Sequence, residues 1–195
     1  MSKVVSSVSL GIDESNHGRD PEFFAGVVTG NAELAQLIRS KYFQRTLGKR
    51  KSGFPQAEWW YLKFEARDIR VLGRERLMVV AACEISKHLQ SRSRNVTDIY
   101  LDGVVTEELL GEMHDRLAKV GIHVALHHDP SADVYRRLVN LADHAARGLF
   151  NAHRDGLTDV KRERRLSYDL SEYVLPRHGR IVVPHGISGQ YMRTE

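Results

Sequence analysis

Leu10-Gly11-Ile12-Asp13-Glu14-Ser15 is the stretch that decides the fold prediction, because an apolar run ends there on two adjacent carboxylates. The residues before it, from Val4 to Leu10, are rich in β-branched side chains and predict a strand. The residues after it, from Asn16 to Pro21, predict a turn. Adjacent residues of a strand point to opposite faces, so Asp13 and Glu14 can share one ligand only if the strand twists, bulges or ends there.

The bulk properties of the chain favour one substantial domain. The 195 residues have a mass of 22.2 kDa, a formal net charge of +4 and a sequence pI near 9.3. This positive balance favours a phosphate-bearing partner without establishing one. The lone Cys83 excludes an internal disulfide and a multi-cysteine zinc site. The sequence shows no secretory or transmembrane pattern, so we expect a soluble cytoplasmic protein with no membrane partner.

The order of the predicted elements indicates the fold class. We expect an α/β fold with a mixed five-stranded sheet, in which three antiparallel strands precede helix-linked strands, flanked by helices. The predicted domain spans 1–150, with a helical and basic insertion at 31–56, and 151–195 forms a C-terminal extension. The predicted strands cover 4–10, 23–29, 59–66, 96–103 and 122–128, and the predicted helices cover 31–42, 67–90, 106–121 and 131–150.

Two more acids occupy positions comparable to those of Asp13 and Glu14. Asp102 ends a β-rich run before Gly103, and Asp143 lies at the edge of the apolar stripe of the last helix. If the ends of the first and fourth strands lie side by side, these carboxylates come together and repel one another unless a cation sits between them. Magnesium and manganese prefer such oxygen ligands, and a pair of these ions can promote phosphodiester hydrolysis.

Each acid also has an ordinary explanation. Asp13 with Glu14, and Asp102 with Gly103, are common at solvated turns. Asp143 can pair with Arg136 or Arg147 on the helix surface, which is worth about 0.3–0.5 kcal/mol. Only their joint placement, at two strand ends and one helix flank, favours an enzyme.

The motifs carry a resemblance to a known superfamily. Gly11-Ile12-Asp13-Glu14, followed by a turn and the run 24–28, resembles the opening of the ribonuclease H-like superfamily, in which type 2 ribonuclease H has Gly-Ile-Asp-Glu-Ala-Gly. The chain is more similar to a domain of unknown function in that superfamily with an Asp-Glu-Ser-Gly (DESG) signature. The run 138–143 resembles the late Leu-Gln-x-Ala-Asp helix motif of that family, where Asn140 stands in place of a frequent glutamine.

The resemblance implies that Asp13, Glu14, Asp102 and Asp143 are catalytic, metal-binding acids that hold Mg²⁺ or Mn²⁺. The chain departs from the pattern after the acids, where Asn16-His17 replaces a small residue and a glycine. The Gly-Arg-Gly motif of type 2 ribonuclease H is also absent.

Further residues are candidates for auxiliary roles. His17 in the first turn, and His128 with Asp129 at the end of the fifth predicted strand, can move a proton or position a leaving group. A basic loop is either an ordinary solvated loop or a contact for a nucleic-acid backbone, through Arg45, Lys49, Arg50 and Lys51.

Three hypotheses follow from the sequence. The leading one is a metal-dependent nuclease or phosphoesterase that hydrolyses phosphodiester bonds of a nucleic acid, whether RNA, DNA or a hybrid. The alternative is a catalytically inactive ribonuclease H-like module that binds nucleic acid or a partner, using the basic loop and the charged run 161–165. The third is a partner-dependent component of a mobile-element or defence system, with the segment from Asn151 onward as its interface.

Overall fold

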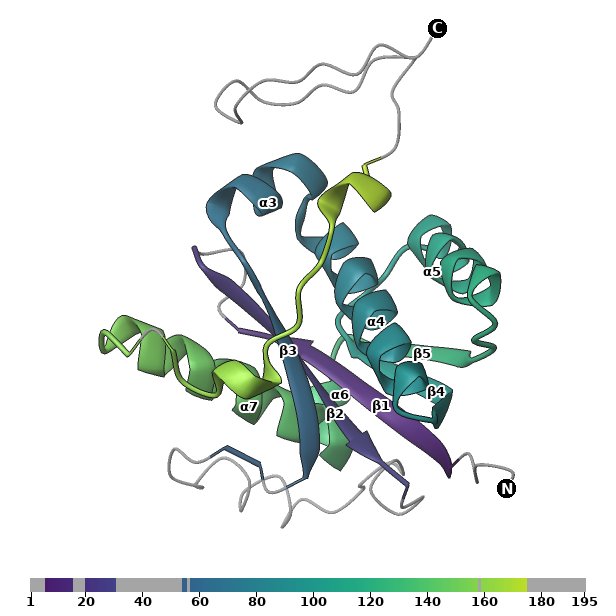
Figure 1. Ribbon diagram of the computed structural model, residues 1–195, viewed down its shortest axis with the longest axis horizontal. Helices are drawn as coiled ribbons and strands as arrows, with labels where there is room; N and C mark the ends of the chain where they lie inside the picture. Colours follow the sequence, from purple (N-terminus) through teal and green to yellow (C-terminus); the bar gives the residue numbers. More distant parts are fainter. Residues whose placement is uncertain (1–5, 16–19, 31–53, 56, 158, 175–195) are drawn as a thin grey trace, which may run out of the picture.

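A five-stranded mixed sheet forms the centre of the molecule (Figure 1). The computed structural model describes residues 6–15, 20–30, 54–55, 57–157 and 159–174. The strands are β1 (Ser6–Glu14), β2 (Glu22–Thr29), β3 (Glu58–Phe64), β4 (Arg94–Asp102) and β5 (Ala125–Asp129). Their order is β3-β2-β1-β4-β5, with β2 antiparallel to its neighbours β1 and β3 and with β4 parallel to β1 and β5. The predicted mixed five-stranded sheet, with three antiparallel strands followed by helix-linked strands, is therefore confirmed.

Helices cover both faces of this sheet (Figure 1). One face carries α3 (Ala66–Leu72), α4 (Arg74–Ser91) and α5 (Glu107–Lys119), and the other carries α6 (Ala132–Tyr135) and α7 (Arg137–Arg154). Alternation along each strand divides the apolar side chains into two clusters. The larger cluster packs under α4 and α5, and the smaller one packs under α7.

Two predicted helices are each divided in the structure. The helix expected over 67–90 is interrupted at Gly73, whose φ of 75° and ψ of 156° lie outside the helical region. The helix expected over 131–150 is interrupted at Arg136, which has extended backbone with φ −112° and ψ 116°. The predicted helix over 31–42 lies outside the described residues, as does most of the 31–56 insertion.

Strand β1 continues through the two acids instead of ending before them. Its antiparallel pairing with β2 includes Asp13 opposite Ala25 and Glu14 opposite Phe24. The one irregularity between β1 and β4 lies earlier, where the register shifts between Val8 and Ser9. Asp13 and Glu14 therefore occupy consecutive positions of a regular strand and face opposite sides of the sheet.

Close packing at Gly11 fixes helix α7 on strand β1. A Cβ atom built on Gly11 would lie 2.7 Å from Cγ and 2.9 Å from the backbone carbon of Leu138. Glycine is therefore needed for this close approach. Because Asp13 follows two positions later on the same face, it projects beside α7.

The segment 159–174 lies against strand β3 and the helices beside it. Arg165 forms an isolated parallel bridge with Tyr61 of β3, and the amide of Leu166 donates to the Tyr61 carbonyl oxygen at 2.8 Å. Figure 1 shows this segment passing over β3 toward α4. As far as it is described, the sequence-predicted extension therefore covers the outer edge of β3.

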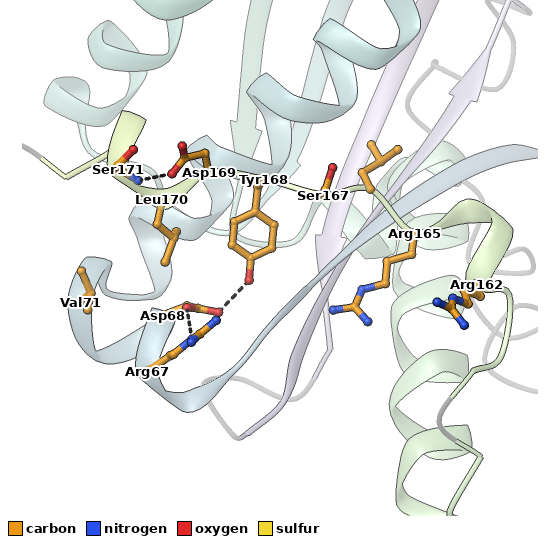
Figure 2. Close-up of a pocket in the computed structure, with 11 residues that line it drawn as sticks. Arg67, Asp68, Val71, Arg162, Arg165, Ser167, Tyr168, Asp169, Leu170 and Ser171 are labelled. Carbon is orange, nitrogen blue, oxygen red and sulfur yellow. Dashed lines mark hydrogen bonds and ion pairs between the residues drawn. The ribbon is translucent and has the colours of Figure 1, made fainter. Parts of the chain in front are cut away.

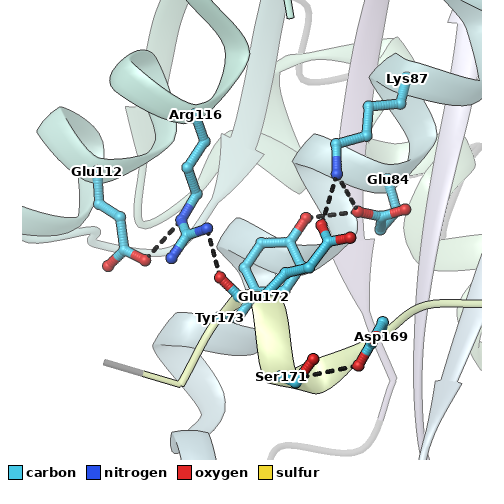
Figure 3. Close-up of polar contacts among 8 residues, drawn as sticks. All are labelled: Glu84, Lys87, Glu112, Arg116, Asp169, Ser171, Glu172 and Tyr173. Carbon is cyan, nitrogen blue, oxygen red and sulfur yellow. Dashed lines mark hydrogen bonds and ion pairs between the residues drawn. The ribbon is translucent and has the colours of Figure 1, made fainter. Parts of the chain in front are cut away.

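Tyr173 anchors the end of this segment between α4 and α5 (Figure 3). The side chain is 1% exposed, and its hydroxyl donates to Oε1 of Glu84 at 2.6 Å. Nη1 of Arg116 donates to the carbonyl oxygen of Glu172 at 2.8 Å. The irregular tail expected from the sequence thus contributes an aromatic side chain to the larger core.

Among the described helices, none combines the length and the apolar character that crossing a membrane requires.

Candidate active site

Asp13 and Asp102 come from the ends of two adjacent parallel strands. The register pairs Gly11 with Tyr100 and Ile12 with Leu101, so Asp13 and Asp102 are the next pair along it. Paired residues of neighbouring strands share a face, which places both acids on the face covered by α6 and α7. The predicted meeting of the first and fourth strand ends is present in the structure.

Asp13 is a buried carboxylate, with only 4% of the residue exposed. Its burial raises its pKa well above the usual range, and the carboxylates of Asp102, Asp143 and Asp133 raise that pKa further. The Arg147 guanidinium acts in the opposite direction and offsets part of this effect. The site therefore holds more negative charge around Asp13 than its nearby cation neutralises.

Helix α7 supplies Asp143 together with its counter-charge. Nη2 of Arg147 lies 2.8 Å from Oδ1 and 2.6 Å from Oδ2 of Asp143, four residues earlier in the helix. The Asp143 side chain is 14% exposed and that of Arg147 is 61% exposed. The surface ion pair considered from the sequence is thus formed with Arg147, beside the other acids.

Asp133 is a further acid of the site. The Asp133 amide at the start of α6 donates to Oδ1 of Asp102 at 3.1 Å, which fixes that carboxylate. The Asp133 carboxylate also contributes to the raised pKa of Asp13. Asp133 was not among the acids predicted from the sequence, although it closely follows the strand-ending Asp129-Pro130 turn.

The donor chemistry of this cluster suits a hard divalent cation, since carboxylate oxygens are the ligands that Mg²⁺ and Mn²⁺ prefer. A positive charge bound beside Asp13 would also stabilise its ionised carboxylate, which burial and the other acids disfavour. Within the part of the chain that the structure describes, however, no three His, Cys, Asp or Glu residues are close enough together to hold a metal ion.

Glu14 lies on the other face of the sheet, toward α4. Arg74, near the start of α4, forms ion pairs with Glu14 and with Glu22, the latter at 3.4 Å between Nε and Oε1. Both glutamates are buried. Glu14 therefore interacts with an arginine on the face opposite to Asp13, and its role as a metal ligand stays a prediction.

The register of β5 places its two histidines on opposite faces of the sheet. His128 pairs with Leu101 on the α4 face, whereas His127 pairs with Tyr100 on the acid face. The His127 ring stacks on Tyr100, with centroids 4.6 Å apart, and its Nε2 lies 3.1 Å from Oδ1 of Asp98. His127 therefore lies on the face of Asp102, and the auxiliary role of His128 stays a prediction.

Asp129 has a local structural contact. It pairs with Asp102 in the β4–β5 register, and its Oδ1 accepts the amide hydrogen of Ser131 at 2.8 Å. Five other predicted residues lie outside the described residues. They are His17, Arg45, Lys49, Arg50 and Lys51.

Comparisons with known proteins find similarity at the level of structure. No family model matches the chain, and no curated protein is similar to it in sequence. The crystal structure of ribonuclease H2 from Pyrococcus horikoshii OT3 is similar with a TM-score of 0.49 and 17% identity, over 85% of this chain and 83% of that chain. A chain in the structure of the PCNA:RNase HII complex from Archaeoglobus fulgidus gives a TM-score of 0.47 and 18% identity, over 79% of this chain and 76% of that chain. At these identities and TM-scores the similarity assigns neither a family nor an activity to the chain.

Proposed function

We propose that the protein is a divalent-metal-dependent nuclease or phosphoesterase that hydrolyses phosphodiester bonds of a nucleic acid. The observation that carries the proposal is the buried Asp13 among Asp102, Asp133 and Asp143, at the ends of two parallel strands and the flank of a helix. A buried carboxylate surrounded by others is costly for folding alone, because each charge opposes the next. Such a cluster is typical of a site that functions with a bound cation.

Asp13, Asp102 and Asp143 would hold Mg²⁺ or Mn²⁺, with Asp133 as a further candidate ligand. The ion would supply Lewis-acid activation of a water and of the phosphoryl oxygens. The chain positions the acids through the rigid pairing of β1 with β4 and through the Asp133 amide that holds Asp102. Arg147, whose side chain is 61% exposed, would contact a phosphate oxygen of the substrate.

Cleavage assays with labelled single-stranded RNA, DNA and RNA–DNA hybrid test the proposal. We expect hydrolysis of at least one substrate with Mg²⁺ or Mn²⁺ and none with EDTA. The Asp13→Asn variant should lose more than about 100-fold in rate, because it removes a ligand charge. Asp115→Asn, the same change on the exposed face of α5, is the matched control and should retain full activity. Cleavage that is unchanged in Asp13→Asn would refute the assignment.

The second candidate is a catalytically inactive module of the same fold that binds nucleic acid or a partner. Two ion pairs favour it, because Arg147 already engages Asp143 and Arg74 already engages Glu14. This candidate predicts salt-sensitive nucleic-acid binding in EDTA that persists in Asp13→Asn and Asp102→Asn. It also predicts no cleavage of any substrate by the unmodified protein.

A further inference from the structure

A pocket of about 730 Å³ lies between α3 and the C-terminal segment, away from the acid cluster (Figure 2). Its volume falls within the range of roughly 300–1,000 Å³ found for small-molecule sites. Asp13, Asp102 and Asp143 are not among its lining residues. Helix α3 contributes Arg67, Asp68 and Val71 to the lining, and the C-terminal segment contributes Arg162, Arg165, Tyr168 and its neighbours.

One end of the pocket is basic. Arg162 and Arg165 lie together at that end in Figure 2, and both are exposed. Among the described residues, neither guanidinium group has an ion-pair partner, whereas Nε of Arg67 lies 3.3 Å from Oδ1 of Asp68. Free guanidinium groups bind phosphate oxygens in a bidentate manner. The basic end is therefore suited to a phosphate group.

Two apolar side chains lie at the opposite end of the pocket, together with the polar Asp169 and Ser171. Figure 2 places Val71 and Leu170 there, with the Tyr168 ring between them and the arginines. Apolar and aromatic side chains are the usual surroundings of a nucleobase or another flat group in a binding site. The pocket thus combines an anion-binding end with a surface for a planar apolar group.

The walls of the pocket are held in place without a ligand. The Arg165–Tyr61 bridge fixes the backbone of the segment that carries the arginines. The Tyr168 hydroxyl lies 2.7 Å from Oδ2 of Asp68 and 3.0 Å from the carbonyl oxygen of Lys63. A preformed site binds with a smaller entropic cost of ordering.

We propose that this pocket binds a nucleotide unit, with its phosphate on Arg162 and Arg165 and its base against Val71, Leu170 and Tyr168. The unit is either a free nucleotide or part of a nucleic-acid strand. Strands β1 and β3 are both antiparallel to β2, so their carboxyl ends lie at the same edge of the sheet. With about 4.8 Å between neighbouring strands, β3 lies roughly 10 Å from β1, which carries Asp13. Asp13 nevertheless faces α7, on the opposite side of the sheet from α3, so a strand held in the pocket would have to pass around the edge of the sheet to reach the acids.

Binding measurements on the full chain test this proposal. Isothermal titration calorimetry in EDTA, with adenosine 5′-monophosphate and with a short single-stranded oligonucleotide as probes, avoids any dependence on cleavage. We expect both to bind, and the Arg162→Glu, Arg165→Glu double variant to bind each about tenfold or more weakly. Lys119→Glu on the exposed end of α5 is the matched control and should bind as the unmodified chain does. If the oligonucleotide binds more tightly than adenosine 5′-monophosphate, the natural ligand is a nucleic-acid strand. If adenosine 5′-monophosphate binds more tightly, the natural ligand is a free nucleotide.

Three results would overturn the proposal: no binding of either probe at millimolar concentration, unchanged binding in the double variant, or inorganic phosphate binding as tightly as adenosine 5′-monophosphate. If the double variant does not fold, the single Arg165→Met variant and a crystal soaked in adenosine 5′-monophosphate replace it. Density for the ligand outside this pocket would then also contradict the assignment. None of these outcomes depends on whether the acid cluster is catalytic.

Discussion

Replacing Asp13 by asparagine is expected to stabilise the protein in the absence of divalent ions. The carboxylate is buried, and burial together with the surrounding carboxylates raises its pKa well above the usual range. Asparagine removes the charge and keeps an oxygen acceptor for the Glu14 amide, which donates to Oδ1 of Asp13 at 2.7 Å. The substitution therefore relieves repulsion with little change in shape.

The size of the effect follows from the cost of a buried, incompletely compensated polar group, which is about 1–3 kcal/mol or more when the group is charged. For a chain of this length, each kcal/mol changes the Tm by about 2–4 °C. We therefore expect the Asp13→Asn variant to unfold about 2–12 °C above the unmodified protein at pH 8 in EDTA. Arg147 limits the gain, since it already offsets part of the repulsion.

The dependence on pH has a definite sign. A carboxyl group whose pKa is raised on folding contributes stability below its unfolded pKa of about 3.9, and that contribution is lost as pH rises through the folded pKa. The advantage of Asp13→Asn should therefore be small near pH 4 and grow toward pH 8. Thermal unfolding followed by circular dichroism in EDTA measures it, with Asp115→Asn as a control that should stay within about 0.5 kcal/mol.

Addition of Mn²⁺ provides a second arm of the same experiment. The ion should raise the Tm of the unmodified protein and have little effect on Asp13→Asn, because ligand binding stabilises only a folded state that contains the site. The reasoning is refuted if Asp13→Asn is no more stable than the unmodified protein at pH 8 in EDTA. Equal stabilisation of both proteins by Mn²⁺ would refute the metal assignment separately.

Three further perturbations test individual contacts. Arg147→Gln removes the ion pair of Asp143 and a positive charge beside the acids. If Arg147 competes with Mn²⁺ for Asp143, calorimetry should show Mn²⁺ binding to this variant about two- to tenfold more tightly. Weaker binding would contradict this competition. Tyr173→Ala removes a buried ring and should lower the free energy of unfolding by about 3–5 kcal/mol in urea; a loss below about 1 kcal/mol would mean that the C-terminal segment is not part of the core. Gly11→Ala places a Cβ against α7 and should lower the free energy of unfolding by about 1–3 kcal/mol. The control Gly111→Ala, on the open face of α5, should raise it by about 0.5–1 kcal/mol. Equal effects of the two substitutions would contradict the close approach of α7.

The sheet was predictable because each strand carries its own signal. The apolar runs are bounded by turns or helices, and the order of antiparallel and helix-linked strands restricts the possible topologies. The break at Gly73 was not predictable, since the apolar periodicity continues through it and single glycines are tolerated in helices. The packing of Tyr168 and Tyr173 was missed because their contacts lie about 100 and 89 residues away in sequence and follow no local period.

The candidate site was predictable to the extent that it depends on strand ends. Asp13 and Asp102 follow similar strands, and parallel neighbours bring their ends together. Strand alternation already indicated that Glu14 needs an interruption after it to reach the same ligand, and the structure instead continues β1 through Glu14. Asp133 was missed because it lies on a four-residue helix that has no periodic pattern.

The cover over β3 has a consequence for chain truncation. An uncovered outer strand presents unpaired amide and carbonyl groups, which can pair with another molecule and start aggregation. The contacts of Arg165 and Leu166 with Tyr61 protect that side of the sheet, while the opposite outer strand, β5, is only five residues long. A chain cut at residue 150, the boundary suggested by the sequence, would lose this protection and leave the site of Tyr173 empty. The segment 159–174 therefore both completes the core and keeps the edge of β3 from pairing with another molecule.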